Sequence, residues 1–317
     1  MFNPEMSYRS LGKSGLKVST FSLGGWTTFG GSVTDTDLVK KIHRRAYEAG
    51  INFFDNADIY AKGESEKIVG LALKEFPRHE LVISSKVFWP MSEDINDKGL
   101  SRKHIMESVH ASLKRMGTDY LDLYFCHRFD PGTPLLETIR AMDDLIRQGH
   151  ILYWGTSEWT GDQLREAHKI CQDGGYYKPQ VEQPQYNLMV RSKFEQDVAP
   201  AARELGMGLV TWSPMASGFL SGKYDRPGEE GRLNKMNWLK NEYLTPANHE
   251  KMMQFKKLSE QKGVERGQIA IAWVAQHPDV SSVILGVTEL EQLEKNLKAM
   301  RVTLSASEDR SLKGLFR

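Results

Sequence analysis

The chain has 317 residues, with 42 basic and 41 acidic side chains and a formal net charge of +1. This balance gives no reason to expect a nucleic-acid partner or an electrostatic attachment to a membrane surface. Its two cysteines, Cys126 and Cys171, suit a reducing compartment, and no segment has the composition of a signal peptide or membrane span, so we expect a cytoplasmic protein.

Short apolar runs rich in Val, Ile, Leu and Phe recur along the chain after an expected hairpin over residues 7–19. Continuous apolar content is typical of strands that are buried on both faces of a parallel sheet. The predicted strands are residues 20–25, 51–55, 81–86, 121–127, 151–157, 179–183, 208–213 and 281–286.

Stretches with helical periodicity lie between these strands. The periodic stretches are residues 38–49, 105–116, 136–146 and 268–276. For the third of them, Thr133 is the expected N-cap and Pro134 the expected first helical residue. Glycines expected to end helices stand at positions 50, 117, 149, 206 and 263.

Strands that alternate with helices predict parallel pairing with right-handed crossovers, and eight such units fit an α/β fold of the (β/α)8 TIM-barrel type. No linker or low-complexity tract divides the chain, so we expect a single domain over residues 1–317. The long polar stretch 222–246, after the seventh strand, is interpreted as a functional loop.

Polar side chains stand at or just past the ends of the predicted strands, where TIM barrels place their active sites. Those expected to carry the chemistry are Asp55, Tyr60, Lys86 and His127. Each has an ordinary structural explanation when taken alone: a loop-capping Asp55, a strand-end Lys86, a packed core His127 and a packed loop Tyr60. Four such residues expected at one cavity mouth favour a shared active site over four unrelated structural roles.

Together these four side chains suit the reduction of a carbonyl group. Lys86 is expected to lower the pKa of Tyr60, which would protonate the carbonyl oxygen, while Asp55 keeps Lys86 charged and oriented. His127 could donate a hydrogen bond to the same oxygen. The hydride must come from a cofactor, because no side chain supplies one.

Other chemistries find less support in the sequence. It contains no G-x-G-x-x-G, no P-loop and no H-E-x-x-H, so we expect no metal site. Cys126 and His127 are adjacent in a strand and should face opposite ways, which argues against a nucleophile pair. The expected substrate pocket consists of Trp26, Tyr60, Trp89, His127 and Arg128. Arg128 could attract an acidic or phosphorylated aldehyde, or it could equally serve the fold.

Several long segments, in one order along nearly the whole chain, resemble the aldo-keto reductase superfamily. They include GINFFDNADIYAKGESEKIVG, LVISSKVFW, YWGTSEW, VEQPQYN and TWSPMASGFLSGKY. The resemblance is strongest to the branch that contains the voltage-gated potassium channel β-subunits and their microbial relatives. It implies that Asp55, Tyr60, Lys86 and His127 are the catalytic residues. The channel subunits carry Asn where this chain has His127, and the long N-terminal extension that some of those subunits have is expected to be missing here.

The same resemblance implies an NADP(H) groove. Asp55, Gly25, Trp26 and Ser32 would border the nicotinamide, whose carboxamide Ser157 and Gln183 would hold. Lys223 and Arg232 would favour the 2′-phosphate of NADP. The remaining implied cofactor contacts are Trp212, Ser213, Pro214, Met215, Ser217, Gly218, Gly286, Thr288, Gln292 and Asn296.

We therefore expect an NADPH-dependent aldehyde or ketone reductase that acts on a small-molecule carbonyl substrate. The alternative is a slowly turning-over, cofactor-sensing regulatory subunit that binds a channel or another protein. The resemblance also implies assembly into a homo-tetramer or larger ring.

Overall fold

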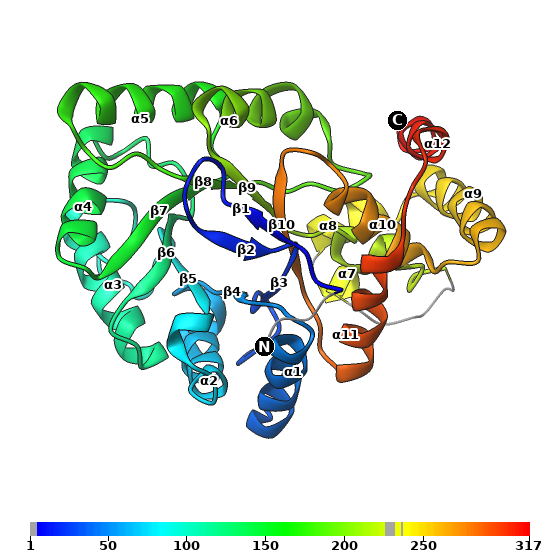
Figure 1. Ribbon diagram of the computed structural model, residues 1–317, viewed down its shortest axis with the longest axis horizontal. Coiled ribbons are helices and arrows are strands. Elements are labelled where there is room, and N and C mark those ends of the chain that lie inside the picture. The colour runs from blue at the N-terminus through cyan, green and yellow to red at the C-terminus, as the bar shows by residue number, and fades with distance from the viewer. Residues whose placement is uncertain (1–4, 226–231, 236) are drawn as a thin grey trace.

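The computed structural model describes residues 5–225, 232–235 and 237–317. Eight parallel strands form a closed barrel in the order β10-β3-β4-β5-β6-β7-β8-β9, as Figure 1 shows. The predicted (β/α)8 barrel is therefore confirmed. The barrel strands are β3 (Phe21–Gly24), β4 (Phe53–Asp55), β5 (Val82–Val87), β6 (Leu121–Cys126), β7 (Ile151–Ser157), β8 (Val181–Gln183), β9 (Gly208–Thr211) and β10 (Val280–Leu285).

The predicted N-terminal hairpin covers one end of the barrel. Its strands β1 (Tyr8–Ser10) and β2 (Lys17–Ser19) pair antiparallel and lie across the barrel end nearest the viewer in Figure 1. Leu11 and Val18 of the hairpin pack with Phe53 and Val82, from the first residues of β4 and β5, in the inner core. The hairpin therefore closes the N-terminal end of the barrel, and the strands' C-terminal ends form the opposite face.

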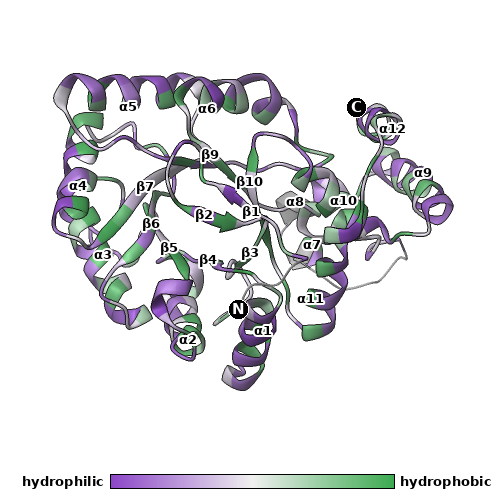
Figure 2. Ribbon diagram, viewed as in Figure 1, coloured by the Kyte–Doolittle hydropathy of each residue, from purple (hydrophilic) through white to green (hydrophobic). Residues whose placement is uncertain are grey.

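Helices surround the barrel, and their apolar faces pack on the outside of the strands in a second, larger core. Figure 2 shows green segments concentrated in the strands and on the helix faces next to them. The longer helices are α1 (Thr36–Glu48), α2 (Glu64–Leu73), α3 (Arg102–Met116), α4 (Leu135–Arg147), α5 (Gly161–Gly174), α6 (Ala199–Leu205), α9 (Pro246–Lys262), α10 (Arg266–Ala275), α11 (Leu290–Leu297) and α12 (Ala306–Leu315).

Shorter helical segments occupy several loops: η1 (Tyr60–Gly63), η2 (Arg78–Glu80), η3 (Phe194–Val198), η4 (Ala216–Ser221) and η5 (Lys298–Arg301). The stretch 222–246, which we expected to be a loop, contains α7 (Arg232–Lys235) and α8 (Asn237–Tyr243) and runs into the first residue of α9. Residues 226–231 and 236 of this stretch lie outside the described part.

Helix ends follow the glycine pattern closely. Gly117, Gly206 and Gly263 are left-handed C-caps, while Gly50 and Gly149 each come one residue after a C-cap. The predicted start of α4 was wrong by one residue. Pro134 occupies the cap itself, and its ring has no group that could make a side-chain cap bond. The Thr133 hydroxyl, which was expected to cap the helix, donates to Asp130, at 2.8 Å.

Within the described residues, every helix is too short or too polar to cross a bilayer.

Candidate active site

Three of the four predicted catalytic side chains are in direct contact at the C-terminal ends of β4 and β5. The Nζ of Lys86 lies 2.7 Å from Oδ2 of Asp55 and 3.2 Å from the hydroxyl of Tyr60. It also donates to the carbonyl of Asn56, at 2.7 Å. Lys86 is fully buried, and Asp55 is nearly so. One ammonium group therefore links a carboxylate and a phenol inside the barrel mouth.

The second carboxylate oxygen of Asp55 is also occupied. It accepts hydrogen bonds from Oγ of Ser84, at 2.7 Å, and from Nε2 of Gln183, at 3.0 Å. Ser157 donates its own hydroxyl to the backbone carbonyl of Gln183. Ser157 and Gln183 thus lie beside Asp55, and their side chains engage the protein itself.

Tyr60 stands at the start of η1, on a loop that is held tightly. One oxygen of Asp58 accepts from the backbone N–H of Ile59, and the other accepts from Ser108 of α3. The two residues after Tyr60, Ala61 and Lys62, have φ of 48° and 52°, in the left-handed region. Such strain persists only where the surroundings impose it, and it is common at functional sites.

His127 follows the last residue of β6 and packs edge-on against Tyr60, with 5.9 Å between the ring centroids. Burial, then the charges of Lys86 and Arg128, lower the pKa of His127 well below its ordinary value near 6.5. The imidazole is therefore neutral at physiological pH. Its buried Nδ1 has no hydrogen-bond partner within the described structure.

The expected net lowering of the pKa of Tyr60 was wrong. Burial, followed by the negative charge of Asp55, raises the pKa of the Tyr60 hydroxyl well above 10, and Arg128 only partly opposes this rise. Burial also lowers the pKa of Lys86, against the opposing charge of Asp55. Tyr60 is thus a fully protonated phenol, so it can donate a proton but does not ionise by itself near neutral pH.

Aromatic side chains border the mouth of this site. Trp89, 38% exposed, packs edge-on against His127, and the guanidinium carbon of Arg128 lies 5.6 Å from the centroid of the Trp89 ring. Trp26 and Trp212 pack edge-on with 5.7 Å between centroids. All five residues predicted for the substrate pocket therefore follow the C-terminal ends of barrel strands.

The residues implied for a nicotinamide groove line the rims of β3 and β9. A Cβ added to Gly25 would lie 2.6 Å from Oγ of Ser65, so a larger residue would have to displace that hydroxyl. Ser32 is exposed and donates to the carbonyl of Thr27. After β9, Ser213, Ala216 and Ser217 have φ between 48° and 57°. Pro214, Met215 and Gly218 belong to this same irregular segment, which leads into η4.

The residues implied for the far end of the groove follow β10. Gly286 is exposed, and the backbone N–H and hydroxyl of Thr288 both donate to Gln292 of α11. Asn296 is 7% exposed, and its Nδ2 has no partner among the described atoms. Lys223 is exposed beyond η4, whereas Arg232 begins α7 and its side chain is outside what the structure describes.

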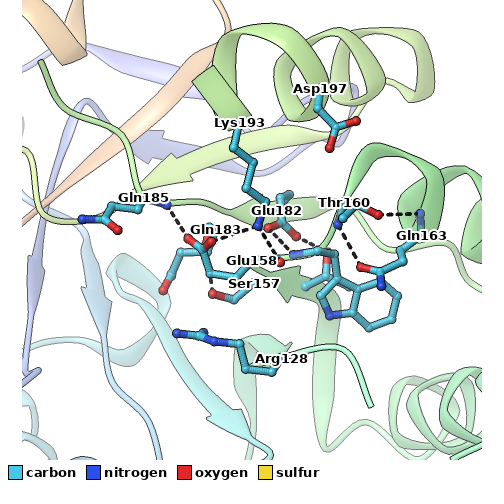
Figure 3. Close-up of polar contacts among 12 residues, drawn as sticks. Arg128, Ser157, Glu158, Thr160, Gln163, Glu182, Gln183, Gln185, Lys193 and Asp197 are labelled. Carbon is cyan, nitrogen blue, oxygen red and sulfur yellow. Dashed lines mark hydrogen bonds and ion pairs between the residues drawn. The ribbon is translucent and has the colours of Figure 1, made fainter. Parts of the chain in front are cut away.

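Sequence reasoning missed three residues of this region. Asn56 and Ser84 contact Lys86 and Asp55, and Ser84 could have been found because it stands two residues before Lys86 on the same strand face. Glu158, which follows Ser157, accepts from the backbone of Gln185, the indole of Trp212 and the ammonium of Lys193. Figure 3 shows this carboxylate beside the ends of β7 and β8.

No group of three or more His, Cys, Asp or Glu suited to a metal ion occurs among the described residues. A cavity between α9, α10 and α12, lined by residues such as Leu258, Ile269 and Leu312, shares no residue with the candidate site.

The fold and these contacts define a (β/α)8-barrel protein with a candidate proton-transfer site at its strand ends. The model of the aldo/keto reductase family matches residues 20–316, and the chain belongs to that family. NAD(P)H-dependent carbonyl reduction is the general activity of aldo/keto reductases.

Curated relatives are similar to this chain over most of its length. A probable voltage-gated potassium channel subunit beta from Arabidopsis thaliana is 46% identical over 303 residues, which cover 94% of this chain and 92% of that protein. A protein of the same description from Oryza sativa subsp. japonica is 44% identical, with the same coverage. A putative subunit of this kind from Schizosaccharomyces pombe is 42% identical over 308 residues, 94% of this chain and 90% of its own. The resemblance stated from the sequence is thereby confirmed.

Proposed function

We propose that this protein reduces aldehydes or ketones to alcohols with NADPH, and that Tyr60 donates the proton. The observation that carries the proposal is the buried contact of Lys86 with both Asp55 and Tyr60, beside a neutral His127. A phenol that is hydrogen-bonded to an ammonium is suited to protonating a carbonyl oxygen.

Each side chain has a definable role in this proposal. Lys86 donates to the Tyr60 oxygen and stabilises the negative charge that develops there as the proton leaves. Asp55 keeps Lys86 charged against the desolvation that lowers its pKa. The neutral His127 ring has one N–H, which can donate to the carbonyl oxygen as negative charge grows on it.

The cofactor would supply a hydride to the carbonyl carbon. The buried Nδ2 of Asn296 supports a nucleotide near α11, because an unsatisfied buried amide costs about 1–3 kcal/mol that a bound acceptor would recover. Lys223 and Arg232 are proposed to contact the 2′-phosphate, while Trp26, Ser157, Gln183 and the segment 212–218 would hold the nicotinamide half.

The first test follows NADPH absorbance with methylglyoxal and 4-nitrobenzaldehyde, with NADH alongside. We expect Tyr60→Phe to lower kcat by at least about a hundredfold, since general acid catalysis is typically worth about 10²–10⁴ in rate. Binding of NADPH, measured by fluorescence quenching, should be retained.

Tyr124→Phe is the matched control. Tyr124 is a fully buried tyrosine on β6 whose hydroxyl has no hydrogen-bond partner within the described structure. Its phenylalanine variant should keep wild-type kcat. Full activity in Tyr60→Phe would contradict the assignment of the proton donor.

A second candidate function has support from the comparisons. The relatives' names describe potassium channel β-subunits, so a regulatory subunit that binds a protein partner and turns over slowly remains the alternative. It would be favoured if the wild type bound NADPH tightly, oxidised none of it with either aldehyde, and co-purified with a channel. Assembly as a homo-tetramer or larger ring is proposed with either function and is tested by light scattering.

A further inference from the structure

Arg128 follows His127 directly and presents its guanidinium at the mouth of the candidate active site. One nitrogen, Nη1, donates to the backbone carbonyl of His127, and the guanidinium lies near the partly exposed face of Trp89. Arg128 itself is half-buried, and its bond to His127 is the one hydrogen bond that its guanidinium makes to the described residues. A guanidinium has five N–H donors, and the protein uses only one of its groups here.

The acidic side chains of this region are committed elsewhere. Asp55 is neutralised by Lys86, at 2.7 Å. Glu158 gives one carboxylate oxygen to Lys193, at 3.0 Å, and the other to Trp212 and a backbone N–H. Asp130 accepts from Leu100, Gly132 and Thr133.

As a result, Arg128 forms an ion pair with no carboxylate in the part of the chain that the structure describes. Figure 3 shows its side chain below Ser157, and no dashed line reaches it. Lys86 and Asp55 cancel each other, and His127 is neutral. The charge of Asp58 also acts on Tyr60, but its oxygens accept from Ile59 and Ser108, so it does not pair with Arg128.

The charge of Arg128 acts on the reacting groups themselves. Arg128 contributes to lowering the pKa of His127 and opposes the rise in the pKa of Tyr60. Charges interact appreciably over a few ångströms in such partly desolvated surroundings. Arg128 adjoins His127, whose ring centroid lies 5.9 Å from that of Tyr60, so an anionic group bound to Arg128 would lie within one small molecule's length of the carbonyl that Tyr60 protonates.

We propose that Arg128 binds a carboxylate of the substrate, so that this protein prefers aldehydes and ketones that carry an acid group. This inference rests on the proposed reductase function. A carboxylate matches the planar fork of a guanidinium and forms two parallel, charge-assisted hydrogen bonds with it. The face of Trp89 lies beside the same fork and can pack against the flat body of an aromatic or conjugated substrate.

The test compares 4-carboxybenzaldehyde with its neutral methyl ester, methyl 4-formylbenzoate, which lacks the negative charge and carries one additional methyl group. With wild-type protein and NADPH, we expect a lower KM for the acid, and we expect that KM to rise with salt because screening weakens the attraction. Arg128→Met should lower kcat/KM for the acid by about ten- to hundredfold, mainly through KM, which is the loss of one charged hydrogen-bonded contact. The ester has no carboxylate to lose, so its KM should stay unchanged, and any loss for the ester should appear in kcat and be smaller than the loss for the acid.

Two further variants control this comparison. Arg128→Lys keeps the charge but not the fork, and should fall between wild type and Arg128→Met for the acid. Arg310→Met makes the same change in net charge at an exposed arginine of α12, and should leave both substrates unaffected.

The outcomes separate this inference from the function on which it rests. Equal losses for acid and ester in Arg128→Met would mean that Arg128 acts through His127 or Tyr60, which overturns the inference. Wild-type protein that reduces the ester as well as the acid overturns it too, while the reductase function stands. If wild-type protein reduces neither compound nor any neutral aldehyde, the proposed reductase function is wrong, and the inferred substrate preference is wrong as well.

Discussion

Lys86 and Asp55 form an ion pair inside the barrel, and the rest of the candidate site depends on it. Their charged atoms lie 2.7 Å apart, with side chains 0% and 4% exposed. Taking two charges out of water costs several kcal/mol per ion, and mutual attraction offsets this only when the remaining hydrogen bonds are made. Here the contacts from Ser84, Gln183 and Asn56 supply them.

Removing one partner of this pair should therefore be costly. We expect Lys86→Met to lower the free energy of unfolding by about 3–5 kcal/mol, because it leaves the carboxylate of Asp55 buried without a counter-charge. The double variant Asp55→Asn/Lys86→Met should recover most of that loss, since neither charge remains and Asn can still accept from Ser84 and Gln183. Urea unfolding measures both values.

Activity should not follow stability in this series. NADPH oxidation should be lost in the single and the double variant alike, because Tyr60 has no ammonium donor in either. A double variant that is as unstable as Lys86→Met would show that the lost charge is not the cause of the instability.

The sequence was sufficient to choose these residues but not to describe their protonation. The apolar runs predict where the strands end, and the candidate residues stand at those strand ends. The pKa of Tyr60 depends instead on how deeply the phenol is buried and on its distance from Asp55, and neither quantity can be derived from spacing along the chain. The same holds for Glu158, whose three partners come from different loops.

At the scale of elements, another buried carboxyl group, that of Glu182, lies where β7, β8 and α5 meet. Glu182 of β8 is fully buried, accepts from the hydroxyl of Thr156 and accepts from the backbone N–H of Trp159, at 3.1 Å. Figure 3 shows it near the start of α5. Burial raises the pKa of Glu182 to about 8.

This carboxyl should make the stability of the fold depend on pH. The raised pKa of about 8 lies above the ordinary value near 4.5, so between these values the folded chain holds a proton that the unfolded chain has lost. Stability from this group therefore falls as pH rises through that window, by up to about 1.4 kcal/mol per pH unit. Glu182→Gln has no proton to lose, so its unfolding free energy relative to wild type should grow from pH 5 to pH 8 and level off above, roughly as the linkage relation requires.

Urea unfolding across this pH range measures the difference. Glu166→Gln, at an exposed position of α5, controls for the loss of a carboxyl group. A Glu182→Gln difference that stays constant with pH would show that Glu182 ionises alike in both states.

Element boundaries could be predicted to within a few residues, because the period of apolar residues changes where strands and helices meet. The predicted N-cap of α4 was wrong by one residue, and there the Thr133 hydroxyl donates to Asp130 and not to the helix. Residues 222–246 were expected to lack helices, since their polar composition hides the short α7 and α8.

For the whole molecule, the seam between β3 and β10 closes the barrel. Leu23 pairs with Leu285, and the next residue, Gly24, faces the inner-core side chain of Ile284. A Cβ added to Gly24 would lie 2.4 Å from Cγ2 of Ile284, far inside van der Waals contact. Glycine is therefore required for the two strands to approach.

Filling this seam should strain the barrel. We expect Gly24→Ala to lower the free energy of unfolding by about 1–3 kcal/mol, as overpacking usually does. Ile284→Leu, which removes the Cβ branch while keeping volume, should cost less than about 1.5 kcal/mol alone and relieve part of the strain in the double variant. Thermal unfolding of the wild type, the two single variants and the double variant measures the coupling between Gly24 and Ile284 as a double-mutant cycle.

Gly15→Ala is the matched control, because nothing lies within 4 Å of a Cβ at that position. It should unfold near the wild-type temperature. If Gly24→Ala also unfolds near the wild-type temperature, a Cβ at position 24 does not strain the contact between β3 and β10.

The closing strand β10 pairs with both β3 and β9, and this has a consequence for how the protein is made. The first barrel strand leaves the ribosome more than 250 residues before the last one can reach it. Until Val280–Leu285 is synthesised, β3 and β9 each present a row of unpaired N–H and C=O groups to other chains. We therefore expect nascent chains that stall or are cut before Val280 to expose two unpaired strand edges, which are prone to pair with other chains.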